Sequence, residues 1–213
     1  ILKLKMKKIN VGIVNYKCNN LFSIHQACKT VGFKTTIIEK KEDKYKYDII
    51  ILPGIGSYGQ ATNYLSKNGI KDKLLNFIEN KNKIVFGICL GMQLLFEKSN
   101  EFGDHEGLGF IKGRVEKINI KQSKKIPNTG WLNLKINNNP NNFLNNINRK
   151  QMFYFTHSFA CKPVDKKIIT SYSKINQYEF CSSINQKNIY GTQFHPEKSH
   201  VNGLNILKLL KKE

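Results

Sequence analysis

The chain has 213 residues, a length typical of one domain with a substantial core, and a formal net charge of +20. Arg114 and Arg149 are the only arginines among its 35 basic residues, and the lysines are scattered along the chain. Surfaces that bind nucleic acid favour arginine for its bidentate contacts with phosphate, so we expect no nucleic-acid partner.

Cysteine spacing and hydropathy exclude further classes of protein. The five cysteines include no C-x-x-C pair, which argues against a metal site or a disulfide framework and favours a reducing, cytoplasmic location. No apolar run approaches the ~20 residues of a membrane-spanning helix, and the basic N-terminus lacks the apolar core of a signal peptide. We expect one domain over 1–213, with 1–7 as a disordered segment or leader and Met6 as a candidate start.

Strands and helices alternate in the N-terminal half. Short apolar runs predict strands at 8–15, 33–38, 48–52 and 84–86. Apolar residues at helical spacing predict helices at 21–31, 58–65, 70–78 and 90–98. This alternation is typical of a parallel sheet covered on both faces, with its active site beyond the carboxyl ends of the strands.

Beyond Phe110 the pattern changes to short β-like runs separated by polar turns, at 114–120, 131–136, 152–156, 167–172, 178–183 and 188–193. The Asn-rich stretch 137–148 is expected to be a surface loop or a short helix, and 199–211 an amphipathic helix. The predicted fold is therefore α/β: a mostly parallel open sheet with flanking helices, plus additional antiparallel strands in the C-terminal half.

Cys89 lies at the predicted turn from a buried strand into a helix, between Gly87 and Gly91. Small neighbours let backbone and substrate approach a side chain held in such a tight turn, as in a nucleophile elbow. The N-terminus of the following helix favours a thiolate there. A buried structural cysteine is the alternative, because a free cysteine also behaves as a small apolar residue.

A thiolate nucleophile needs a base, and His195 is the best placed of the five histidines because it directly follows a predicted strand. Glu197 lies two residues later, beyond Pro196. In an extended segment these two side chains point the same way, so the carboxylate can orient the imidazole as the third member of a triad does. A histidine satisfied within a turn is the alternative interpretation.

An acyl-transfer site also needs donors for an oxyanion. The Leu90 N–H at the helix start and a backbone N–H around Gly54 and Ile55 are the candidates. The same segment, 54–59, fits the dinucleotide-binding pattern G-x-G-x-x-G, but it follows the third predicted strand and no acidic residue ends the next strand. We therefore disfavour nucleotide binding.

Three stretches together resemble the triad-type (class I) glutamine amidotransferases. They are Pro53-Gly54-Ile55-Gly56, Gly87-Ile88-Cys89-Leu90-Gly91-Met92-Gln93 and Gln193-Phe194-His195-Pro196-Glu197. Among the members of that family, the chain is most similar to the glutaminase subunits of imidazole glycerol phosphate synthase. The resemblance covers nearly everything after Lys7.

The resemblance implies that Cys89 attacks the carboxamide carbon of L-glutamine, that His195 protonates the departing ammonia, and that water then hydrolyses the thioester. It implies no cofactor. It also implies that the amino-acid end of the substrate is held by Gln93 and by the stretch His157, Ser158 and Phe159.

The implied partner is a (β/α)₈-barrel cyclase subunit, which forms a heterodimer with the glutaminase and uses its ammonia in histidine biosynthesis. Positions that face this partner match Asn15, Trp131, Tyr154 and Lys198. Core packing is the alternative for Trp131, because a lone tryptophan is more often buried than exposed.

Two segments near the expected partner face depart from the family pattern. The segment that usually reads Asn-Tyr-Gly-x-Gly-Asn is Asn15-Tyr16-Lys17-Cys18-Asn19-Asn20 here, without either glycine, and the usual Pro-His-x-Gly-Trp has Asn128 in place of histidine. These departures leave the catalytic residues intact and put the identity of the partner in question.

Four alternatives therefore stay open. A paralogous glutaminase that supplies ammonia to a sugar amidotransferase, for surface polysaccharide modification, would share the whole site. A free-standing γ-glutamyl hydrolase would work without a partner. A catalytically inactive binding module and a basic nucleic-acid binder are the non-enzymatic alternatives.

Overall fold

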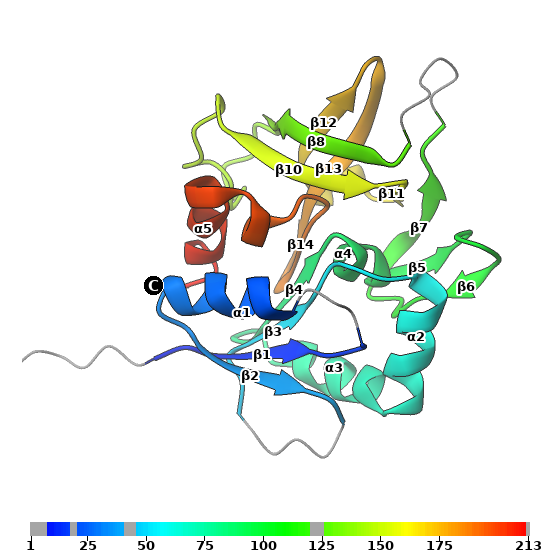
Figure 1. Ribbon diagram of the computed structural model, residues 1–213, viewed down its shortest axis with the longest axis vertical. Helices are drawn as coiled ribbons and strands as arrows, with labels where there is room; N and C mark the ends of the chain where they lie inside the picture. The colour runs from blue at the N-terminus through cyan, green and yellow to red at the C-terminus, as the bar shows by residue number, and fades with distance from the viewer. Residues whose placement is uncertain (1–7, 18–20, 41–45, 120–125, 212–213) are drawn as a thin grey trace, which may run out of the picture.

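An eight-stranded sheet organises the computed structural model, which describes residues 8–17, 21–40, 46–119 and 126–211 (Figure 1). Five neighbouring strands are parallel, in the order β2-β1-β3-β4-β14, and three antiparallel strands, β13-β12-β9, extend the sheet. Their bounds are β1 Asn10–Val14, β2 Lys34–Ile38, β3 Ile49–Leu52, β4 Ile84–Ile88, β9 Lys135–Ile136, β12 Ile169–Ile175, β13 Tyr178–Gln186 and β14 Ile189–Thr192.

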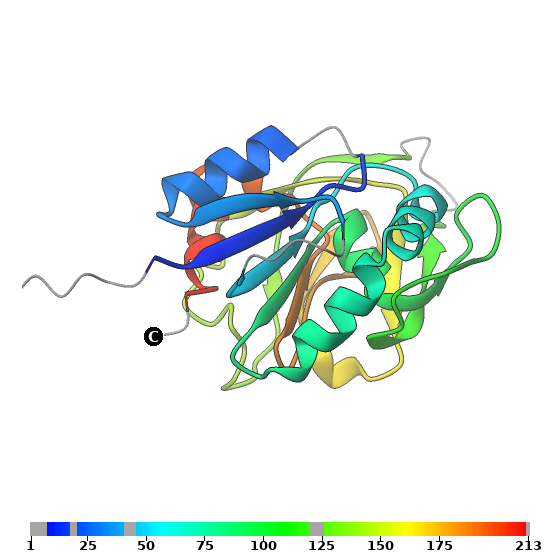
Figure 2. The ribbon, with the colours of Figure 1, turned by 90° about the horizontal axis from the view of Figure 1, so that it is seen from below.

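Helices cover both faces of the parallel strands (Figures 1 and 2). On one face α1 (Leu21–Thr30) lies beside α5 (His200–Lys208), and on the other lie α2 (Tyr58–Lys67), α3 (Ile70–Glu79) and the short α4 (Leu90–Leu94). Strand β3 is apolar throughout because Ile49 and Ile51 pack in the core beneath α1 and α5, whereas Ile50 and Leu52 pack in the core beneath α2 and α3.

Two smaller sheets are built from the middle of the chain. Four strands pair in the order β11-β7-β5-β6, and β8 forms an antiparallel ribbon with β10. Their bounds are β5 Phe96–Ser99, β6 His105–Glu106, β7 Ile111–Lys117, β8 Asn128–Asn133, β10 Met152–His157 and β11 Phe159–Pro163. Two 3₁₀ turns, η1 (Lys166–Ile168) and η2 (Pro196–Lys198), precede β12 and α5.

The predicted fold class is confirmed, because the parallel strands lie in the N-terminal half and at β14, and antiparallel strands are added by the C-terminal half. The prediction of a helix over 90–98 is wrong in its second half, since α4 ends at Leu94 and β5 begins at Phe96. Phe96 is fully buried opposite Ile111 of β7, so strand pairing overrides the helical propensity of this segment.

The C-terminal predictions differ in two further places. The run 131–136 is split between the ribbon strand β8 and the edge strand β9, and β11 was not predicted. The Asn-rich stretch 137–148 is a loop, one of the two structures expected for it, and it buries Leu144 and Ile147. The predictions for 1–7 concern residues outside the described part of the chain. Among the described residues, no helix is long and apolar enough to cross a membrane.

Close backbone packing explains the two glycines that flank residue 89. A Cβ atom on Gly91 would lie 2.0 Å from the carbonyl oxygen of Leu52, at the end of β3. A Cβ on Gly87 would lie 2.6 Å from the backbone carbonyl carbon of Gly91. Helix α4 can therefore begin directly against the sheet only because both positions lack side chains.

We expect Gly91→Ala to lower the free energy of unfolding by ~1–3 kcal/mol or more, because overpacking at a backbone contact outweighs the better helix propensity of alanine. Urea denaturation measures the change. Ser66→Ala, at an exposed position of α2, is the control and should stay within about 0.5 kcal/mol of wild type. A Gly91→Ala protein as stable as this control would contradict the packing argument.

Candidate active site

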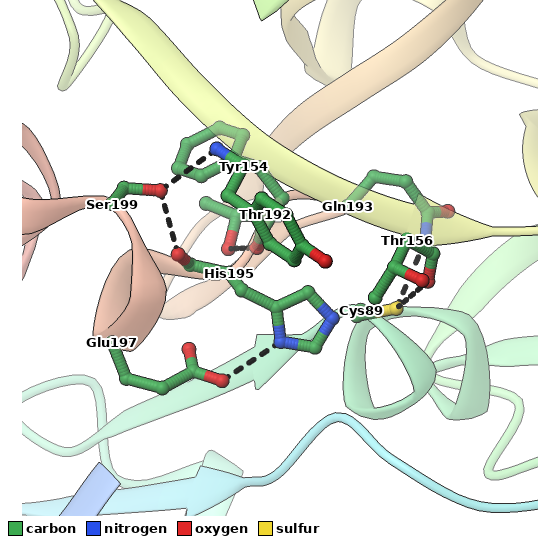
Figure 3. A network of polar contacts seen from close by, with 9 residues as sticks. Cys89, Tyr154, Thr156, Thr192, Gln193, His195, Glu197 and Ser199 are labelled. Atoms are coloured by element: carbon green, nitrogen blue, oxygen red, sulfur yellow. Dashed lines mark hydrogen bonds and ion pairs between the residues drawn. The ribbon is translucent and has the colours of Figure 1, made fainter. Parts of the chain in front are cut away.

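Cys89 occupies a strained position between β4 and α4. Its φ is 47° and its ψ is −102°, a conformation that a residue with a side chain rarely adopts, and it is 5% exposed. Its N–H donates to the carbonyl oxygen of Thr192 at 2.7 Å, which ties the turn to the end of β14. The predicted elbow is therefore present, and it turns the sulfur towards the segment that follows β14 (Figure 3).

His195 is fixed through its backbone beyond the end of β14. Its N–H donates to the Tyr154 carbonyl of β10 at 2.9 Å, and its carbonyl accepts from the Ser199 hydroxyl at 2.7 Å. The Nδ1 of its ring lies 2.7 Å from Oε1 of Glu197, and both side chains are almost completely buried. Because the carboxylate accepts from Nδ1–H, the other ring nitrogen faces the sulfur of Cys89 (Figure 3).

Three distant segments of the chain meet at Gly54. A Cβ atom at this position would lie 3.0 Å from Cβ of Cys89 and 3.0 Å from Cε1 of His195. The segment after β3 therefore lies against both the nucleophile and the imidazole at the carboxyl edge of the sheet.

The neighbouring groups of the triad change the pKa of His195 in this buried site. Burial lowers the pKa of His195, but the neighbouring Cys89 and Glu197 outweigh burial and raise this pKa from 6.5 to about 10. The ring is then an imidazolium at neutral pH and can pair with a thiolate. A raised pKa in the folded state stabilises the fold fully below pH 6.5, and this contribution is lost as the pH rises through about 10.

A cleft of about 660 Å³ opens beside the sulfur. All of the residues predicted for substrate and oxyanion binding line it, namely Gly54, Ile55, Leu90, Gln93, His157, Ser158 and Phe159. Tyr154 and Lys198, predicted to face a partner, line it as well. Five other lining residues were not predicted from the sequence, namely Glu101, Phe102, Lys117, Ile126 and Thr156.

The side chain of His157 is held by the protein itself. Its Nδ1–H donates to the Phe159 carbonyl at 2.8 Å, and its Nε2 accepts from the Asn128 amide at 3.1 Å. Burial lowers the pKa of His157 to about 4, so the ring is neutral. Its predicted contact with substrate, and those of Ser158 and Phe159, stay predictions. The position of His157 favours a role in shaping the cleft wall.

Three of the predicted partner residues, Trp131, Tyr154 and Lys198, lie on or near the β8–β10 ribbon. Trp131 is 38% exposed, so it is not a core residue, and its ring stacks on His200 at 5.2 Å between centroids. Tyr154 meets the same indole edge-on at 5.8 Å, and the ammonium of Lys198 lies 5.8 Å from the centre of the Tyr154 ring.

Asn15 lies elsewhere, after β1. Its side chain accepts from the Lys17 N–H at 2.9 Å and donates to Glu39 at 3.1 Å, and Lys17 has a positive φ of 62°. Lysine therefore adopts here a conformation that glycine adopts more easily.

The chain matches a known protein family over nearly its whole length. The model of the family "Glutamine amidotransferase class-I" matches residues 12–210. The chain is 40% identical over 202 residues to the imidazole glycerol phosphate synthase subunit HisH of Sulfurimonas denitrificans, and the match covers 93% of this chain and 95% of the relative. It is also 40% identical over 201 residues to the protein of the same name from Wolinella succinogenes, covering 93% and 97% of the two chains.

Solved structures show the same fold at lower sequence identity. PurLQS from Thermotoga maritima matches with a TM-score of 0.75 and 20% identity, covering 96% of this chain and 98% of that one. A structure described as a glutamine amidotransferase matches with a TM-score of 0.73 and 17% identity, covering 95% and 99%.

We expect Glu197→Gln to lower the pKa of His195, because the variant loses the carboxylate that stabilises the imidazolium. Nitrogen NMR of the imidazole rings across a pH series measures this pKa, with the His195 signals assigned by their loss in His195→Ala. Glu79→Gln, at an exposed position of α3, is the control and should titrate like wild type. An unchanged His195 titration in Glu197→Gln would contradict the charge coupling.

Proposed function

Because the chain belongs to the class-I glutamine amidotransferases, and among them to the family of the imidazole glycerol phosphate synthase subunit HisH, we propose that it is a glutaminase subunit that hydrolyses L-glutamine to glutamate and ammonia. The observation that carries the proposal is the convergence of Cys89, His195 and Glu197 at one edge of the sheet. A thiolate, an imidazolium and an orienting carboxylate are the groups that amide cleavage through a thioester requires.

The proposed reaction begins when the Cys89 thiolate attacks the carboxamide carbon of glutamine. Negative charge moves onto the amide oxygen, and we assign its stabilisation to the Leu90 N–H and a backbone N–H of residues 54–56, which line the cleft. The His195 imidazolium gives its proton to the leaving nitrogen, so ammonia departs and a glutamyl thioester remains. Neutral His195 then takes a proton from water, the resulting hydroxide attacks the thioester, and glutamate leaves as the thiolate is restored.

We place the amino-acid end of glutamine against the far wall of the cleft. The substrate carries an ammonium and a carboxylate there, so the wall must offer both signs of charge. Glu101 is the acidic residue among the described residues that line the cleft, and Lys117 is a basic one. One oxygen of Glu101 accepts from the Tyr58 N–H at 2.7 Å, which fixes the carboxylate in place. Gln93, on α4, also lines the cleft.

The ammonia is proposed to pass to a (β/α)₈-barrel cyclase subunit that makes imidazole glycerol phosphate in histidine biosynthesis, with the two subunits forming a heterodimer. Tyr154 and Lys198 line the cleft and also pack against the cluster around Trp131. The cleft is therefore lined in part by residues of the surface assigned to the partner. Asn15, after β1, is assigned to the partner face by the family resemblance alone.

A paralogous glutaminase that feeds a sugar amidotransferase is the second candidate. The loss of both glycines after Tyr16 and the replacement of histidine by Asn128 favour it, since both changes lie near the expected partner face. The chemistry of the cleft is the same for both candidates, so the captured partner distinguishes them.

We expect Cys89→Ala to abolish release of ammonia from glutamine while the protein stays folded, because the alanine side chain cannot form a thioester. A coupled assay of glutamate formation, together with urea unfolding, measures both properties. Cys181→Ala, which alters a buried cysteine of β13, is the control and should keep its activity. Glutamine hydrolysis by Cys89→Ala would reject the proposed function.

We expect Trp131→Ala to weaken partner binding at least tenfold, because aromatic anchors carry much of the affinity of an interface. A pull-down from the native cell, identified by mass spectrometry, supplies the partner, and titration calorimetry measures its affinity. Phe22→Ala, at an exposed aromatic position on α1, is the matched control. An imidazole-forming barrel supports the first candidate and a sugar amidotransferase the second, whereas wild-type affinity in Trp131→Ala would remove the indole from the interface.

A further inference from the structure

The carboxamide of Gln193 lies beside the nucleophile. Gln193 is fully buried, and its Nε2 is 3.5 Å from the sulfur of Cys89 (Figure 3). The residue follows β14 directly, and its backbone N–H donates to the Ser182 carbonyl at 2.9 Å. The amide is therefore placed by the same strand end that places His195.

The hydrogen-bond network fixes which end of this amide faces the sulfur. Nε2 of Gln93 is 3.1 Å from the carbonyl oxygen of Phe159, which can only accept, so Gln93 presents a donor on this side. The same nitrogen is 3.2 Å from Oε1 of Gln193. The oxygen of Gln193 therefore faces Gln93, and its NH₂ group faces Cys89.

The other neighbours of the sulfur show which protonation state this contact favours. The carbonyl oxygen of Thr156 lies 3.8 Å from the sulfur and can accept the S–H of a neutral thiol. A thiolate has no proton to donate and needs donors instead. Gln193 offers one 3.5 Å from the sulfur, and the ring of His195 faces the sulfur from another side (Figure 3).

We propose that Gln193 donates a hydrogen bond to the Cys89 thiolate and so raises the fraction of ionised nucleophile at neutral pH, with Gln93 holding the Gln193 amide in the required orientation. This inference rests on the proposed function, since it concerns the nucleophile of that reaction. A hydrogen bond to a charged group is stronger than one to a neutral group, and burial strengthens it further. Gln93 then acts on the sulfur indirectly, as a positioning residue, besides its place in the cleft wall.

Gln193→Met and Gln193→Glu test the proposal. Methionine has a similar length and no donor, and glutamate has the same shape but carries a negative charge towards the sulfur. The measured quantity is the rate of alkylation of Cys89 by iodoacetamide as a function of pH, followed on the Cys89 peptide by mass spectrometry. Only the thiolate reacts, so this rate reports its population without using glutamine.

We expect Gln193→Met to slow alkylation about tenfold or more at neutral pH, as the loss of one bond to a charged group predicts, and to regain the wild-type rate at alkaline pH. Gln193→Glu should move the pH of half-maximal labelling further upward, because its carboxylate repels the thiolate. Gln26→Glu, at an exposed position of α1, is the control and should leave the profile unchanged.

An unchanged labelling profile in folded Gln193→Met or Gln193→Glu protein would overturn the proposal, even if glutamine hydrolysis were reduced, because the residue would then act through packing alone. Circular dichroism and urea unfolding establish that each variant is folded. If Gln193→Met does not fold, the isosteric Gln193→Glu decides the test. A wild-type protein that shows the expected labelling but does not hydrolyse glutamine would reject the proposed function and leave this inference standing.

Discussion

Parallel pairing of β4 with β14 is the constraint on which the site depends. Ile88 lies opposite Thr192 in this pair, and one residue further on the N–H of Cys89 donates to the Thr192 carbonyl. His195 follows within three residues. The two strands come from distant parts of the chain, so this pairing is entropically costly, and the burial of both sheet faces under helices offsets the cost.

The β8–β10 ribbon carries Trp131 and also contacts the catalytic residues. In β10, the carbonyl oxygen of Tyr154 accepts from the N–H of His195, and the carbonyl oxygen of Thr156 lies 3.8 Å from the sulfur of Cys89. The side chain of Tyr154 packs on Trp131, which lies opposite it in β8. One ribbon therefore contacts the nucleophile and the imidazole and also carries the exposed indole. A partner bound at Trp131 would contact the same ribbon that contacts the catalytic residues.

Sequence reasoning succeeded where local patterns are strong. The apolar strands of the parallel sheet and the glycines around Cys89 carry their own signal. The spacing of His-Pro-Glu after a strand predicted that the side chains of His195 and Glu197 meet, and they are 2.7 Å apart. It failed where pairing between distant segments decides the structure. Phe96 continues a helical pattern in sequence but is buried in a strand opposite β7, and the edge strand β9 is assigned by its pairing with β12. Glu101 carried no signal in the sequence, and Gln193 stood in a recognised stretch without an assigned role, because the roles proposed for both depend on what they face across the fold.

The turn after β1 keeps a left-handed residue without a glycine. Lys17 has a φ of 62°, and the side chain of Asn15 holds the turn by accepting from the Lys17 N–H. A hydrogen bond from a neighbouring side chain can therefore stabilise a backbone conformation for which glycine is the usual residue. At this position the absence of glycine in the sequence does not imply the absence of the turn.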